Sequence, residues 1–194
     1  PVCLDEIATH CLKIYSSIRY WMQDESRFGL KTITRRRLTL QKVKPIVKVQ
    51  WPFKAFYLYG LVEPLTGVLI IKDYDQVNTE NFQQFLNNVS QKYPKDFHVI
   101  QVDNASFHRA KSLITPDNVM LLYQPPYSPQ VNSSERLWQW SKGEIANTLF
   151  ANIEHLKATL NHLFQSKSNE FFASLTAMEF VSDALLKISV LPTI

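Results

Sequence analysis

The chain has 194 residues, of which 45% are apolar and 12% aromatic, a composition that excludes a disordered or fibrous protein. No apolar run reaches the roughly 18 to 20 residues of a membrane helix, and no charged-then-apolar leader opens the chain, so we expect a soluble, unexported protein. The two cysteines cannot form a disulfide framework, and the length suits a single domain over residues 1–194.

The net charge of +4 conceals a strong asymmetry along the chain. The stretch between Ser26 and Val62 holds no Asp or Glu but nine basic residues, namely Arg27, Lys31, Arg35, Arg36, Arg37, Lys42, Lys44, Lys48 and Lys54. The remainder is net acidic. A solvated basic face is one interpretation, but a block without counter-charges favours binding to a polyanion, most economically the phosphate backbone of DNA or RNA.

The first half of the chain predicts a helix, a strand and a hairpin. Apolar residues at helical spacing from Leu4 to Tyr15 predict an amphipathic helix, and a strand follows around residues 18–23, with Asp24 near its end. Residues 53–62 and 68–71 are rich in aromatic and β-branched side chains. The Pro and Gly between these runs suit a reversing turn, so we expect an antiparallel hairpin.

A second helix and two buried strands are predicted next. Apolar residues recur at helical spacing over residues 82–93, behind Asn78 and Thr79 as candidate caps. The runs 97–102 and 119–123 are too short for helices, and the connection between them suits a compact crossover, so we expect parallel neighbouring strands. Ligands bind at the carboxyl ends of such strands, and Asp103 directly follows the first one.

The last third of the chain predicts helices. Helical spacing runs from residue 133 to 149, with Asn132 or Ser133 as cap and Glu135 in the first turn. Further helices are expected over residues 153–164 and within 171–191. One face of the first of these helices could continue a DNA-binding surface through Trp138, Gln139 and Lys142. Some aromatic residues could stack on flipped bases or, as is commoner, pack in the core: Tyr127, Trp138 and Trp140.

Asp24, Asp103 and Glu135 lie in three separate segments of the sequence and form a candidate metal site. An acidic side chain within an apolar run is expected to be buried, and burying its charge costs free energy unless a cation neutralises it. Three converging carboxylates repel one another unless divalent cations neutralise them, and hard oxygen ligands select Mg²⁺ or Mn²⁺. Each acid also has an ordinary interpretation as a turn, cap or helix-start residue. Glu25 competes with Asp24, but strand alternation sends the two to opposite faces.

These elements have the layout of an α/β, ribonuclease H-like fold, with a mixed five-stranded sheet flanked by helices and extra helices at the C-terminus. Three segments narrow the prediction further: residues 24–29 (DESRFG), 103–108 (DNASFH) and 125–138 (PPYSPQVNSSERLW). They resemble the three signatures of the DDE transposases in bacterial insertion sequences of the mariner superfamily.

The resemblance implies a metal-dependent enzyme that cleaves DNA at transposon ends and transfers the strands. Asp24, Asp103 and Glu135 would be the catalytic triad, holding two Mg²⁺ or Mn²⁺ ions about 4 Å apart. Asn104 and His108 could position substrate or orient a ligand, and for His108 the alternative is a loop histidine with no role. The residues expected to contact double-stranded DNA are Arg27, Lys31, Arg35, Arg36, Arg37, Lys42, Lys44 and Lys142. By analogy we also expect a homodimer in the bacterial cytoplasm, associated with the nucleoid.

The chain departs from this family at two points. Where the family usually has Pro two residues before its catalytic Glu, this chain has Ser133-Ser134, so we expect Glu135 to be held less firmly. The family reads transposon ends through an upstream helix-turn-helix domain, and only 23 residues precede Asp24, so we expect that domain to be absent from this chain. An inactive or domesticated remnant that binds DNA without cutting it is therefore the alternative function. Another nuclease of the same fold fits the carboxylates but not the motif at residues 125–129.

Overall fold

The computed structural model describes residues 14–36, 38–125 and 131–178. The helix predicted from Leu4 to Tyr15 falls almost wholly outside these residues, and so do Arg37 and Tyr127. The helices predicted within 171–191 are described only as far as residue 178.

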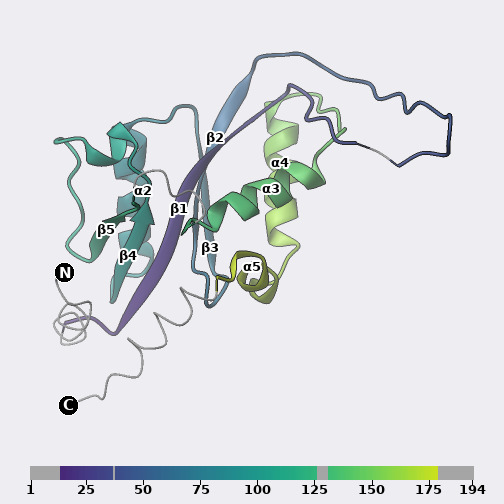
Figure 1. The fold of residues 1–194 in the computed structure, drawn as a ribbon. Helices are drawn as coiled ribbons and strands as arrows, with labels where there is room; N and C mark the ends of the chain where they lie inside the picture. The colour runs from purple at the N-terminus through teal and green to yellow at the C-terminus, as the bar shows by residue number, and fades with distance from the viewer. Residues whose placement is uncertain (1–13, 37, 126–130, 179–194) are drawn as a thin grey trace.

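A five-stranded sheet in the order β3-β2-β1-β4-β5 organises the molecule (Figure 1). The central strand β1 (Ser17–Gly29) pairs antiparallel with β2 (Ala55–Val62) and parallel with β4 (Asp96–Val102). β3 (Leu69–Tyr74) and β5 (Val119–Tyr123) form the two edges, and β5 is parallel to β4. The predicted mixed sheet, hairpin and parallel pair are thereby confirmed.

Strand β1 is longer than the sequence suggested, and the prediction that Asp24 lies near a strand end is wrong. The strand stays paired with β2 as far as Gly29 because Phe28 carries the apolar pattern beyond the charged residues and stacks on Phe56. Asp24 therefore lies in mid-strand, opposite Gly60 of β2.

The turn of the predicted hairpin forms between Glu63 and Val68, where the Glu63 N–H donates to the Val68 carbonyl. Gly67 has a φ of +70°, a left-handed conformation that favours glycine. A Cβ at Gly67 would also lie 1.7 Å from the Asn169 carbonyl oxygen, so this turn packs closely against a later helix. β2 begins two residues later than predicted, at Ala55, and ends at Val62 as predicted. β3 extends three residues beyond the predicted end, to Tyr74.

The helices cover both faces of the sheet (Figure 1). Helix α2 (Thr79–Lys92) begins at Asn78, whose side chain accepts from the Asn81 N–H at 2.8 Å, and it packs on one face through Phe82, Phe85, Leu86 and Val89. The opposite face carries α3 (Ser134–Glu144), α4 (Ile153–Gln165) and α5 (Asn169–Thr176). Among the described residues, no helix has the length and apolar character to cross a membrane.

Helix α3 ends at Glu144, five residues before the predicted end. Asn147 has a φ of 59°, which a continuing helix excludes. Its N–H donates to the Ile33 carbonyl at 2.7 Å, and its side-chain oxygen accepts from the Arg35 N–H at 3.3 Å. These contacts with the segment after β1 replace the last predicted turn.

The tryptophans of α3 belong to the core. Trp138 is 4% exposed, and Trp140 packs edge-on against Phe164, Phe171 and Phe172. The interpretation of these two rings as core residues is confirmed, and a base-stacking surface on this helix face would need other side chains.

Candidate active site

Asp24 and Asp103 lie on the two strands at the centre of the sheet. The parallel ladder between β1 and β4 ends with the pair Met22 and Gln101, and each aspartate lies two residues beyond that pair. β4 itself ends at Val102, so Asp103 directly follows the strand as predicted. The register therefore brings two acids from distant parts of the chain to the same level of the sheet.

Asp24 faces helix α3. The Trp138 Nε1–H donates to Asp24 Oδ2 at 3.0 Å. Gly60 leaves room for this indole, because a Cβ at Gly60 would lie 2.5 Å from Trp138 Cζ2. Burial, together with the nearby negative charges of Glu25 and Asp103, raises the pKa of Asp24 to about 7. Asp24 is thus a fixed carboxyl group whose charge is unfavourable without a cation.

Glu25 makes its contacts on the other side of the strand. Its Oε1 accepts from Gln23 Nε2 at 2.7 Å and lies 3.3 Å from His108 Nε2. Its side chain is only 9% exposed. The alternation expected for Asp24 and Glu25 is seen in these separate partners, and the side chain of Glu25 is largely enclosed by the site.

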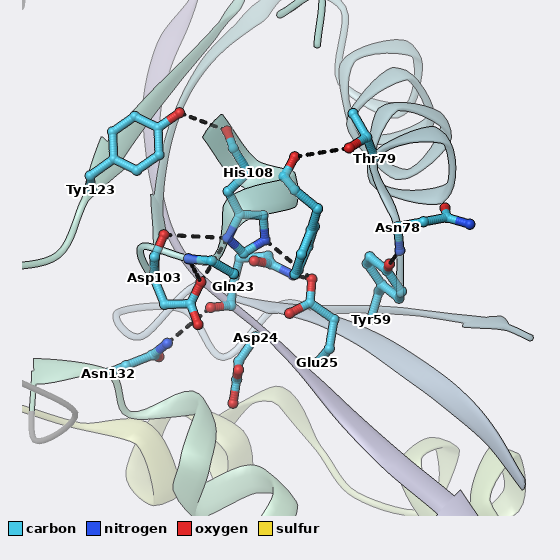
Figure 2. Close-up of polar contacts among 12 residues, drawn as sticks. Gln23, Asp24, Glu25, Tyr59, Asn78, Thr79, Asp103, His108, Tyr123 and Asn132 are labelled. Carbon is cyan, nitrogen blue, oxygen red and sulfur yellow. Dashed lines mark hydrogen bonds and ion pairs between the residues drawn. The ribbon is translucent and has the colours of Figure 1, made fainter. Parts of the chain in front are cut away.

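His108 bridges Glu25 and Asp103 (Figure 2). It comes from the short 3₁₀ helix η1 (Ser106–Arg109), its side chain is 1% exposed, and its Nδ1 lies 2.8 Å from Asp103 Oδ1. Burial lowers the pKa of His108, but the hydrogen bonds to Asp103 and Glu25 outweigh it and raise the pKa to about 9. The bond from His108 in turn lowers the pKa of Asp103. The bridge therefore keeps Asp103 ionised.

Asn104 and Tyr123 tie η1 to the neighbouring strand. Asn104 Nδ2 donates to the Gln124 carbonyl at 2.6 Å, just after β5, and Tyr123 donates its hydroxyl to the His108 carbonyl at 2.8 Å. Arg109 donates to the Asn104 side-chain oxygen. Asn104 thus makes contacts that hold the loop carrying Asp103.

Glu135 lies in the first turn of α3 and is exposed. In the part of the chain that the structure describes, no three His, Cys, Asp or Glu side chains come close enough together to hold a metal ion. The structure therefore brings Asp24 and Asp103 together but does not gather all three acids. Carboxylate oxygens are nevertheless the ligands that a hard divalent cation prefers. Among the described residues, both hydrogen bonds to the Asp103 carboxylate use Oδ1, so Oδ2 could bind a cation.

The predicted DNA contacts fall into two groups. Lys31, Arg35, Arg36, Lys42 and Lys44 are exposed on the long connection from β1 to β2, which we call the basic arm (residues 31–54), and Arg27 is exposed at the end of β1. Lys142 differs, because it is partly buried on α3, where its Nζ lies 5.5 Å from the centre of the Phe28 ring. Burial lowers the pKa of Lys142.

Sequence reasoning missed the roles of Gly60 and Trp138 at Asp24. A signal for the first exists, because a lone glycine inside a strand often marks a close approach of another group. No local pattern could identify Trp138 as its partner, since Trp138 and Asp24 are 114 residues apart.

Comparison with known proteins agrees with this fold. The sequence profile described as DDE superfamily endonuclease matches residues 19–157. An uncharacterized protein of Sinorhizobium fredii (strain NBRC 101917 / NGR234), y4pE/y4sA, is 28% identical over 102 residues, which are 52% of this chain and 76% of that protein.

Among solved structures, the Mos1 transposase paired-end complex with the left transposon end has a TM-score of 0.65 at 22% identity. The similarity covers 89% of this chain and 55% of that one. The Mos1 strand transfer complex gives a TM-score of 0.63 at 22% identity, over 89% and 54% of the two chains. The chain thus spans about half the length of the Mos1 chains, with which it shares the ribonuclease H-like fold. Since the family profile matches more than half of its residues, the chain belongs to the DDE superfamily of endonucleases.

Proposed function

We propose that this chain is the catalytic domain of a DNA transposase that cleaves phosphodiester bonds at transposon ends and transfers the cut strands. The observation that carries the proposal is the meeting of Asp24 and Asp103 at the same level of neighbouring central strands. Two Mos1 structures of the same fold, a paired-end complex with the left transposon end and a strand transfer complex, support the assignment of substrate.

Asp24, Asp103 and Glu135 are the proposed ligands of two Mg²⁺ or Mn²⁺ ions. Bound there, such ions would activate a water or a 3′-hydroxyl and stabilise the leaving oxygen. The burial that raises the pKa of Asp24 to about 7 supports a nearby cation, because a divalent charge stabilises the ionised carboxylate. The Mn and Mg complexes of Mos1 agree with this choice of metals.

The protein's own groups orient these ligands. Trp138 holds one oxygen of Asp24, and His108 holds one oxygen of Asp103. Asn104 fixes the loop behind Asp103 through the Gln124 carbonyl. Such neighbours set the direction of a metal ligand and are commonly important for metal affinity.

The basic arm and Lys142 are the proposed contacts to double-stranded DNA, both transposon ends and target. The described cations of the arm are exposed and can reach phosphates without desolvation of a core. Arg27 extends the positive surface from the arm to the end of β1, close in sequence to Asp24.

The remaining parts of the proposal concern assembly. We propose that residues 1–194 belong to a single catalytic domain. The active assembly is a homodimer in the bacterial cytoplasm, associated with the nucleoid. Sedimentation of the purified chain with and without DNA tests the dimer.

The test of function is nicking of a labelled DNA duplex with Mg²⁺ or Mn²⁺, beside an Asp103→Ala variant and a metal-free control. Metal-dependent cleavage that vanishes in the variant supports the proposal. Cleavage that persists in the variant contradicts the site assignment. DNA binding without cleavage favours the alternative, a domain that binds DNA without cutting it.

A further inference from the structure

The start of helix α3 is held by buried polar side chains. Asn132 is 7% exposed and Ser134 only 1%. The helix cap Ser133 makes no side-chain capping bond. Buried polar groups of this kind need partners, and here the partners lie on the sheet rather than in the helix.

Two of these bonds reach strand β1 beside Asp24. Asn132 Nδ2 donates to the Gln23 carbonyl at 2.9 Å (Figure 2), and Ser134 Oγ donates to the Met22 carbonyl at 3.1 Å. The Ser134 N–H also donates to Asn132 Oδ1 at 3.0 Å, which orients the amide. Gln23 directly precedes Asp24, and Ser134 directly precedes Glu135. The bonds therefore join the start of the helix that carries Glu135 to the two residues of β1 that precede Asp24.

A third bond reaches strand β4 beside Asp103. Gln101 Nε2 donates to the Val131 carbonyl at 2.8 Å, and the Gln101 side-chain oxygen accepts from the Tyr20 hydroxyl. Gln101 lies two residues before Asp103. We call the four residues Gln101, Val131, Asn132 and Ser134, with their partners on β1, the polar seam. It connects the three chain segments that carry the three acids.

Directional bonds explain why these positions are polar. Apolar side chains would also fill the space, but they would fix neither the rotation of α3 nor its height along β1. A proline at position 133 would make the helix start rigid through its ring. In this chain the rigidity comes instead from hydrogen bonds between residues 109 and 112 positions apart.

We propose that Asn132 and Ser134 are positioning residues that fix the start of helix α3, which carries Glu135, against the strands that carry Asp24 and Asp103, and thereby set the affinity of the site for divalent cations. This inference rests on the proposed function, because it takes the three acids as the metal ligands. The absence of proline at position 133 led us to expect a loosely held Glu135. We infer instead that the hydrogen bonds of the polar seam hold the start of the helix in place.

The test compares Ser134→Ala and Asn132→Leu with Ser133→Ala. The control removes a hydroxyl that is equally buried, but among the described residues its hydrogen bond goes to Met22 Sδ, at 2.9 Å, and not to the backbone of β1. Mn²⁺ binding is measured by electron paramagnetic resonance of the free ion, and stability is measured by urea unfolding of the metal-free proteins. Nicking of labelled DNA is recorded for the same samples.

We expect Ser134→Ala and Asn132→Leu to weaken Mn²⁺ binding roughly tenfold, a typical effect of losing a residue that orients a ligand. Ser133→Ala should bind Mn²⁺ like the wild-type protein. Ser134→Ala removes one oxygen only, so it decides the question if Asn132→Leu fails to fold.

Each other result overturns a defined part of the argument. If the wild-type protein binds and nicks but Ser134→Ala binds Mn²⁺ equally well, the seam has no positioning role and the proposed function stands. If Ser133→Ala loses as much affinity as Ser134→Ala, the effect is general loosening and the inference is wrong. If the wild-type protein neither binds Mn²⁺ nor nicks DNA, the proposed function fails and the inference fails with it.

Discussion

The centre of the sheet and the basic arm are built in opposite ways. At the centre, Asp24, Glu25 and Asp103 are each held by a named donor: Trp138, Gln23 and His108 respectively. On the arm, long apolar and basic side chains are exposed, among them Leu38, Leu40, Ile46, Lys42 and Lys44. Placing a metal ligand requires atoms fixed to a fraction of an ångström, whereas attracting phosphates requires only charge.

The arm is nevertheless anchored where it leaves the sheet. The Thr32 N–H donates to the Gln50 carbonyl at 3.1 Å, and Gln50 Nε2 donates to the Phe150 carbonyl at 3.2 Å. The contacts of Asn147 with Ile33 and Arg35 fix the same region. The base of the arm therefore belongs to the folded core, and substitutions further along it should leave the centre unchanged.

The largest expected effect is the loss of activity in Asp24→Asn. An amide preserves the size of the side chain and can still accept from Trp138, but it is a poor ligand for a hard cation. We expect nicking to fall to the level of the metal-free control. Activity close to wild type would remove Asp24 from the catalytic site.

The same variant should be more stable than the wild-type protein when metal is absent. The pKa of Asp24 is raised from 3.8 to about 7, so between these values the unfolded chain loses a proton that the folded chain keeps. The free energy of unfolding therefore falls as pH rises through this window. The free energy of unfolding of Asp24→Asn should exceed that of the wild-type protein by roughly 1–3 kcal/mol at pH 8, and the two should be equal near pH 4. Urea unfolding with EDTA checks this, and an equal difference at both pH values would contradict it.

His108→Asn should reduce nicking by roughly 10- to 100-fold, because asparagine cannot bridge Asp103 and Glu25. The matched control is His162→Asn, since His162 is exposed on α4. Initial rates at saturating Mn²⁺ provide the measurement. Equal rates for the two variants would show that the bridge is not needed for catalysis.

Gly60→Ala and Gly143→Ala compare the centre with the arm directly. The new Cβ at Gly60 meets the Trp138 ring at 2.5 Å, and Trp138 is packed in the core. The Cβ at Gly143 meets only the guanidinium of Arg35, at 2.4 Å, which can move into solvent. We expect Gly60→Ala to lose roughly 1–3 kcal/mol of unfolding free energy. Gly143→Ala should be neutral or up to about 1 kcal/mol more stable. Similar losses of unfolding free energy in the two variants would contradict the view that the centre of the sheet is packed more rigidly than the arm.

The smallest effect on stability is expected for Lys42→Gln, Lys44→Gln and Lys48→Gln combined. All three lysines are exposed, so unfolding free energy should change by no more than about 0.5 kcal/mol. DNA affinity should fall, and the slope of log affinity against log salt should become shallower by up to about 3. Fluorescence anisotropy over a salt series measures this, and an unchanged slope would exclude these lysines as phosphate contacts.

Local patterns were sufficient for most elements of the fold. Short apolar runs predicted β4 and β5 and their parallel pairing, and helical spacing behind Asn78 predicted α2. The end of β1 was missed because Asp24, Glu25 and Arg27 interrupt the apolar pattern while their backbone stays in the ladder. Buried charged residues in the middle of a central strand are uncommon unless they are paired, so a rule that ends a strand at such residues fails here.

The other differences depend on contacts between distant segments. Helix α3 ends early because Asn147 binds the base of the arm. The missing side chain of Gly60 leaves the space that the Trp138 ring occupies. Neither relation leaves a periodic trace in the sequence. The identities of the three acids could be proposed from motifs, but the joint role of Asp24, Asp103 and Glu135 in metal binding stays a prediction.

The long sequence separations between contacting segments also affect how the domain folds. Trp21 of β1 bonds to His98 of β4, 77 residues away, and Gln23 bonds to Asn132, 109 residues away. Contacts of such sequence separation form late, because a large loop must close before they can stabilise the fold. On the ribosome the first aspartate therefore emerges long before its partners, and synthesis proceeds at roughly 5–20 residues per second. A nascent or truncated chain that lacks α3 contains neither Trp138 nor Glu135, so under the proposed function we expect it not to nick DNA.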